Sequence, residues 1–133
     1  FYFESDPDDF IGQGQKRLLK APATTFDLTT EGSQLNVTLQ DAALWQGYIV
    51  PMVPLTQLQV GYYGNVTQFN DARGLINWSA YGRGCDIATA WFVVDNVAYT
   101  AGALTAIDVR FEQRCKSSTG SLRGKLHWRS NGP

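Results

Sequence analysis

The amino-acid sequence predicts an all-β fold, namely a single-domain antiparallel β-sandwich of jelly-roll-like type with roughly eight or nine strands and one disulfide. Three observations predict it. Several short runs alternate between apolar and polar residues, glycine-rich turns separate them, and no run shows convincing helical periodicity. Because the chain has 133 residues and neither an internal repeat nor a Pro/Ser-rich linker, we expect one domain over residues 1–133.

The individual strands are predicted from these runs. Residues 35–39 and 107–112 alternate with a period of two, as a half-buried strand does. In residues 122–129 the leucines, a glycine and Trp128 share one face, and basic residues share the other. Residues 91–94 are apolar on both faces, which predicts a central strand. The best candidate for a helical turn, residues 41–45, is too short to be stable unaided.

The two cysteines, Cys85 and Cys115, are expected to form a disulfide. There is no CxxC motif and the single histidine, His127, is remote in sequence, so a zinc site fits poorly. A turn at residues 100–103 would close a hairpin between strands at about 92–99 and 104–112, bringing both cysteines to one end. Such a bond contributes about 3–4 kcal/mol and indicates an oxidising compartment. Two buried free thiols are the alternative.

Composition excludes several classes of protein. An aromatic content of 13% and short apolar runs argue against a disordered chain and against a transmembrane segment. The net charge of −1 argues against a nucleic-acid partner. Charge is also unevenly spread, because residues 21–72 contain no Lys or Arg and lie between an acidic start and a basic end.

Five stretches resemble a poorly characterised group of bacterial secreted or surface-associated β-rich modules. They are S-D-P-D-D-F-I-G-Q-G-Q at 5–15, G-R-G-C-D at 82–86, W-F-V-V at 91–94, D-V-R-F-E-Q-R-C at 108–115 and S-L-R-G-K-L-H-W at 121–128. The group's pattern is S-x-P-G-D-Y-I-G-G-G-Q, then G-R-G-C-N, then D-x-x-F-E-Q-H-C, so Asp8, Asp86 and Arg114 depart from it. The resemblance implies a secreted or cell-surface module with paired cysteines, and it implies no particular biochemical activity.

The acidic opening is the one candidate for a metal site. Four carboxylates lie within six residues, at Glu4, Asp6, Asp8 and Asp9. Calcium takes 6–8 oxygen ligands, so this segment could supply part of a calcium site, the only cofactor indicated. A solvated turn before Phe10 is the simpler interpretation.

Aromatic and amide side chains form the candidate ligand site. We expect stacking on sugar rings by four aromatic residues, Tyr62, Tyr63, Trp78 and Tyr81. Hydrogen bonds to sugar hydroxyls are expected from three polar residues between them in the sequence, Asn70, Asp71 and Arg73. The alternative for each ring is a place in the sandwich core.

The basic face of the last predicted strand carries Arg123, Lys125, His127 and Arg129. It would attract an anionic polymer, or it would pair with acidic residues of neighbouring strands such as Asp108 and Glu112. We favour the pairing.

The predicted function is a non-catalytic extracellular binding module whose partner is a polysaccharide or other glycan. The sequence has one histidine and neither a GxSxG nor an HExxH motif, which favours binding over catalysis. A structural or self-assembling surface or filament subunit is the alternative, with the apolar residues 1–3 pairing with a neighbouring sheet edge. A small glycan-active hydrolase ranks last.

Overall fold

The structure, a computed structural model, describes residues 1–131. Within that range the chain forms ten strands and one short 3₁₀ helix, β1 (Tyr2–Ser5), β2 (Lys16–Leu18), β3 (Thr25–Glu31), β4 (Gln34–Gln40), β5 (Leu44–Val50), β6 (Gly61–Val66), η1 (Asp71–Arg73), β7 (Leu75–Ala80), β8 (Ile87–Thr100), β9 (Ala103–Cys115) and β10 (Leu122–Arg129). The predicted all-β antiparallel sandwich is confirmed, with ten strands in place of eight or nine.

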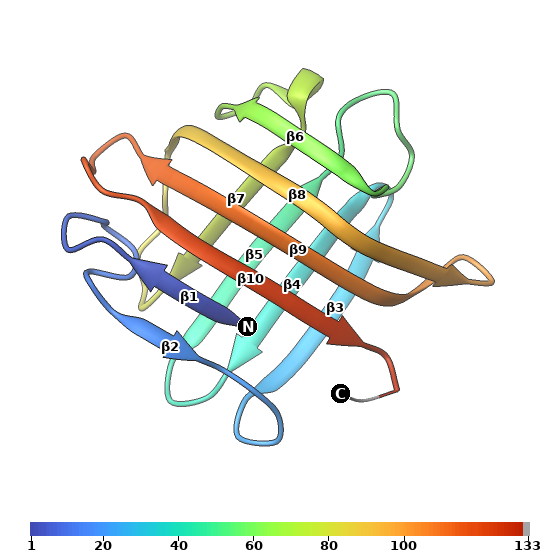
Figure 1. The fold of residues 1–133 in the computed structure, drawn as a ribbon, viewed down its shortest axis with the longest axis horizontal. Helices are drawn as coiled ribbons and strands as arrows, with labels where there is room; N and C mark the ends of the chain where they lie inside the picture. Colours follow the sequence, from blue (N-terminus) through green and yellow to red (C-terminus); the bar gives the residue numbers. More distant parts are fainter. Residues whose placement is uncertain (132–133) are drawn as a thin grey trace.

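Two antiparallel sheets make up the sandwich. The six-stranded sheet has the order β2-β1-β10-β9-β8-β6, and the four-stranded sheet has the order β3-β4-β5-β7. Figure 1 shows the six-stranded sheet in front, with its strands running across those of the sheet behind. Consecutive strands are mostly neighbours, so meanders rather than the Greek keys of a jelly roll dominate the topology.

The long β8–β9 hairpin has the turn that the sequence predicts. Thr100 pairs with Ala103, and the two residues between them have positive φ, 50° at Ala101 and 82° at Gly102. This two-residue turn matches the right-handed twist of the flanking strands. At the other end of the hairpin, Cys85 and Cys115 form the expected disulfide, with their Cα atoms 5.2 Å apart.

Aromatic rings fill the space between the sheets. Trp78 is fully buried, with its ring centroid 4.7 Å from that of Phe1 and 5.3 Å from that of Phe111. The indole lies against Gly47 of the neighbouring strand, where an added Cβ would be 2.5 Å from an indole carbon. A large ring on β7 therefore requires glycine on β5.

A buried glutamine joins the two sheets. Gln113 of β9 is fully buried, and its amide nitrogen donates to the Trp78 carbonyl at 2.9 Å. Its amide oxygen accepts from the Trp78 backbone N–H at 2.8 Å. Because β7 is the edge strand of the four-stranded sheet, this side chain supplies the hydrogen bonds that a further strand would otherwise make.

One expectation about local structure is wrong. The N-terminal strand does not offer a free edge, because β1 pairs with β2 on one side and with β10 on the other. Phe1 and Phe3 are buried in the core, so the self-association expected through residues 1–3 has no accessible strand in this structure. Residues 41–45, which are too short for a stable helix, form none: the Asp41 carboxylate accepts from the Ala43 N–H, and β5 begins at Leu44.

Candidate functional site

Two of the aromatic residues expected to bind sugar lie in the core. Trp78 is 0% exposed and Tyr63 is 3% exposed, and the Tyr63 ring stacks on Phe92 with centroids 4.5 Å apart. Neither ring has a face available to a ligand, so the stacking role expected for these two residues is wrong.

The other expected ligand residues are dispersed. Tyr62 is 65% exposed on the outer face of the six-stranded sheet, 6.5 Å from the Trp91 ring. Tyr81 follows β7, donates its hydroxyl to Gln15 and lies under the Arg83 guanidinium. The polar residues Asn70, Asp71 and Arg73 are exposed at η1, where the Asn70 side chain caps the helix by accepting from the Ala72 N–H.

The acidic opening does not gather into a cluster. Glu4 accepts a hydrogen bond from Tyr2, Asp6 pairs with Arg123, and Asp8 is exposed. Asp9 is buried and accepts from the Ser5 hydroxyl and the Gly12 N–H through Oδ2. Over residues 1–131, no three His, Cys, Asp or Glu side chains lie in an arrangement able to hold a metal ion. Calcium binding at this segment stays an untested prediction.

Acidic neighbours pair with most of the basic face of β10, as expected. Arg123 bonds Asp6 at 3.0 Å and lies 3.6 Å from Glu112, while His127 and Arg129 both contact Asp108. The Arg123 guanidinium and the Ser121 N–H lower the pKa of Asp6. Burial raises the pKa of Asp108, but hydrogen bonds from Arg129 and His127 outweigh it and lower the pKa.

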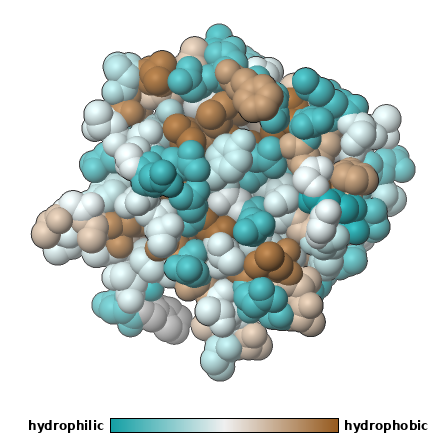
Figure 2. All heavy atoms as spheres, turned by 180° about the vertical axis from the view of Figure 1, so that it is seen from behind, coloured by the Kyte–Doolittle hydropathy of each residue, from teal (hydrophilic) through white to brown (hydrophobic). Residues whose placement is uncertain are grey.

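The outer side of the four-stranded sheet brings together polar side chains, most of them uncharged, and we call it the polar face. Alternation places every second residue of each strand outward, while the intervening residues are buried. Strand register aligns these residues in two rows across the sheet, Thr29–Asn36–Tyr48–Asn77 and Asp27–Thr38–Gln46–Ser79. Figure 2 shows this side of the molecule, where teal and white dominate and the brown areas are separate.

The polar face is hollowed around Tyr48. A depression of about 350 Å³ is lined by residues of three adjacent strands, Asn36, Val37, Thr38, Gln46, Gly47, Tyr48, Asn77 and Ser79. A second depression of about 280 Å³ shares Gln46 and Ser79 with the first and continues to Leu44 and Arg83. The two adjoin at Gln46 and Ser79 and form one groove.

Several groups in this groove are free to bind a ligand. Within residues 1–131, the side chains of Thr38, Gln46, Tyr48 and Ser79 make no hydrogen bond to the protein. An amide and three hydroxyls offer both donors and acceptors. Tyr48 is half-buried, and its neighbours in the row across the sheet are Asn36 and Asn77. An aromatic ring between amides combines an apolar surface with hydrogen bonds, as recognition of a sugar requires.

The charges near the polar face are sparse and mostly negative. Asp27 and Glu31 lie on β3 at one edge, and the depression around Tyr48 is lined by no Lys, Arg, Asp or Glu. Arg83 is at the far end of the groove, where its guanidinium donates to the carbonyls of Phe10 and Ile11. The arrangement favours a neutral ligand over an anionic one.

Sequence reasoning missed this set of residues. The signals were present, because residues 35–39 alternate and residues 21–72 lack Lys and Arg. The sequence does not reveal that β4, β5 and β7 are neighbours, and only that pairing brings Asn36, Tyr48 and Asn77 together.

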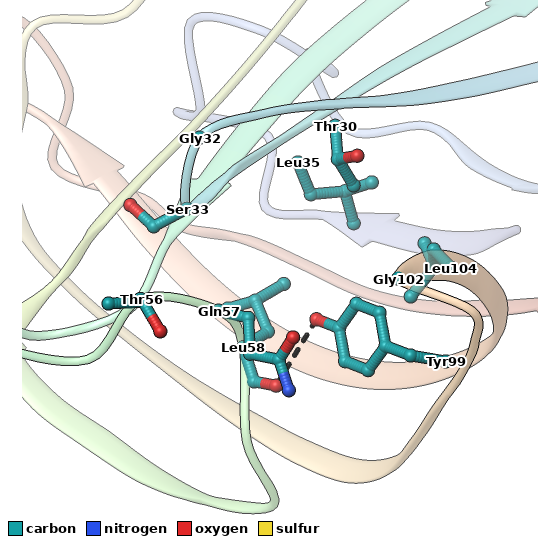
Figure 3. A pocket seen from close by; sticks show the side chains of 10 residues that line it. All are labelled: Thr30, Gly32, Ser33, Leu35, Thr56, Gln57, Leu58, Tyr99, Gly102 and Leu104. Carbon is teal, nitrogen blue, oxygen red and sulfur yellow. Dashed lines mark hydrogen bonds between the residues drawn. The ribbon is translucent and has the colours of Figure 1, made fainter.

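A third hollow is too small for a sugar. Figure 3 shows it between the β3–β4 turn, residues 56–58 and the β8–β9 hairpin, with the Tyr99 hydroxyl directed at Leu58. Its volume is about 70 Å³, room for about two water molecules. Tyr99 donates to the Leu58 carbonyl at 3.2 Å, and burial raises the pKa of Tyr99.

Comparisons with protein-family models, with curated proteins and with solved structures find no match for this chain. Within residues 1–131, no helix has the length and apolar character needed to cross a membrane.

Proposed function

We propose that the protein is a non-catalytic glycan-binding module whose polar face binds a neutral oligosaccharide chain over Tyr48. The observation that carries the proposal is the groove of unpaired hydroxyl and amide groups around this ring. These side chains project from three paired strands of one sheet, so the backbone that carries them is already ordered before a ligand binds.

The Cys85–Cys115 disulfide supports a secreted or cell-surface location, because such bonds persist in oxidising compartments. The resemblance to bacterial secreted modules agrees with this location. A polysaccharide outside the cell is then the natural partner.

Binding to a panel of neutral polysaccharides, including xylan, galactomannan and mixed-linkage β-glucan, tests the proposal. We expect affinity electrophoresis to show retardation by at least one of them. Calorimetry with the matching oligosaccharide should then show that Tyr48→Ala weakens binding by about 30-fold or more, since truncating a central aromatic residue costs about 2 kcal/mol or more. Raising the salt concentration should leave the affinity unchanged, because the ligand is neutral.

Tyr62→Ala is the matched control, because Tyr62 is an exposed aromatic residue on the opposite sheet. It should bind as the unmodified protein does. A loss of binding with Tyr62→Ala and none with Tyr48→Ala would overturn the assignment of the site. The absence of binding to every glycan tested would remove the function.

A further inference from the structure

A second concave site, which we call the apolar groove, opens where the two sheets meet at the end of β10. Its volume is about 510 Å³, within the range of roughly 300–1,000 Å³ of small-molecule sites. The end of β10 forms one wall, and residues 18–26, which leave β2 and enter β3, form the other. These elements meet in the lower part of Figure 1.

Carbon-rich side chains line the apolar groove. Phe1 and Leu19 are buried, Phe26 and Trp128 are partly buried against the core, and Leu18 is 61% exposed. The groove exists because β2 has only three residues, after which the chain crosses to the other sheet and leaves this corner of the sandwich uncovered. An apolar ligand would cover surface that water now contacts.

The rim of the groove is cationic. Lys20, His127 and Arg129 line it, and among residues 1–131 no Asp or Glu does. Asp108 holds both His127 and Arg129, whereas Lys20 forms no ion pair within residues 1–131. The positive charge of Lys20 is therefore complementary to an anionic group on a ligand whose remaining surface is apolar.

We propose that the apolar groove binds a free long-chain fatty acid, with the acyl chain against Phe26 and Trp128 and the carboxylate at Lys20. This site is separate from the polar face, and its ligand is apolar and anionic where the proposed glycan is polar and neutral. A test of one proposal therefore does not decide the other. Each methylene added to the chain increases affinity about fourfold until the groove is filled.

Saturated fatty acids of 8 to 16 carbons, used below their micelle concentrations, test the proposal by calorimetry. We expect saturable binding of one molecule per protein, with affinity rising with chain length. The methyl ester should bind about tenfold more weakly, because it carries no charge for Lys20 to attract. Lys20→Ala should weaken binding of the acid and leave binding of the ester unchanged.

Leu18→Glu tests the location of the site. Leu18 is exposed, so the variant should fold, and its added carboxylate should weaken binding by at least tenfold. Val60→Glu is the matched control, because Val60 is 64% exposed and precedes β6 at the opposite edge of the same sheet. It should bind normally.

A fatty acid brominated along its chain provides a separate readout. It should quench tryptophan fluorescence, and Trp128→Phe should remove most of the quenching while affinity stays within about threefold, because phenylalanine keeps an aromatic wall. Four outcomes would each overturn the proposal. They are no binding of fatty acid, an affinity that does not depend on chain length, a loss of binding with Val60→Glu equal to that with Leu18→Glu, and binding to phosphatidylglycerol vesicles without binding to free fatty acid.

Discussion

Gln113 offers the sharpest test of how the two sheets are held together. Replacing it by methionine keeps the length and approximate volume of the side chain but removes both hydrogen bonds to the Trp78 backbone. The N–H and carbonyl of Trp78 are then buried without partners, since the residue is 0% exposed. No neighbouring strand can replace the bonds, because this side of β7 has none.

The expected loss follows from these two groups. A buried backbone group without a partner costs about 1–3 kcal/mol, so Gln113→Met should lower the free energy of unfolding by about 4 kcal/mol. With an unfolding entropy of about 2.1 cal/mol/K per residue, a domain of this size should lose roughly 14 °C in Tm. Few single substitutions have an effect as large.

Thermal and urea unfolding followed by circular dichroism measure the loss. Gln46→Met is the matched control, because Gln46 is an exposed strand residue whose side chain makes no hydrogen bond within residues 1–131, and it should change stability by less than about 0.5 kcal/mol. Gln113→Glu adds a signature in pH. Burial raises the folded-state pKa of the new carboxyl above its unfolded value, so this variant should be most stable below about pH 4 and lose stability as pH rises. If Gln113→Met were no more destabilising than the control, the amide would not join the sheets.

Two further predictions concern packing and pH. Gly47→Ala should lower the free energy of unfolding by about 1–3 kcal/mol, because the added Cβ would lie 2.5 Å from an indole carbon of Trp78. Gly84→Ala is the control, since its Cβ would meet no atom within 4 Å, and it should leave the free energy of unfolding, measured in urea, unchanged. The hydrogen bond from the Ala43 N–H lowers the pKa of Asp41; burial opposes this effect, and Arg17 adds to it. The ionised carboxylate therefore stabilises the fold at pH values above its unfolded pKa of about 3.9, and this stabilisation is lost as the pH falls through the lower folded pKa. Unfolding midpoints between pH 7 and pH 2 should therefore decline less steeply for Asp41→Asn, and a parallel decline would contradict the pairing.

Alternation within a single strand was enough to predict much of the fold. It placed Phe92, Phe111 and Trp128 in the core, where the two phenylalanines are buried and Trp128 is partly buried. The hairpin prediction brought Cys85 and Cys115 to the same end, where they are bonded. These features depend on a period of two and on a short turn, which local sequence determines.

Features that depend on distant pairing were not predictable from one sequence. From the aromatic composition alone, Trp78 could equally be a ligand-binding residue or a core residue. Its burial depends on Gly47, which lies 31 positions earlier in the chain and pairs with it across the sheet. The same limit applies to the polar face, whose rows exist only in the observed strand order. In the strand Leu75–Ala80, alternation did separate Trp78 from Asn77 and Ser79, but it did not tell which side faces water.

The pairing of β1 with β10 has a consequence for the order of folding. β1 pairs with β2, which follows closely in the chain, and with β10, where Phe3 is opposite Gly124, more than a hundred residues later. At synthesis rates of about 5–20 residues per second, β1 lacks its β10 neighbour for on the order of ten seconds after β2 has been made. The meander β3–β4–β5 can form meanwhile from neighbouring segments. We therefore expect a nascent chain that ends before β10 to have an incomplete sandwich in which the aromatic residues of β1 are exposed. Such a chain should depend on chaperones at that stage.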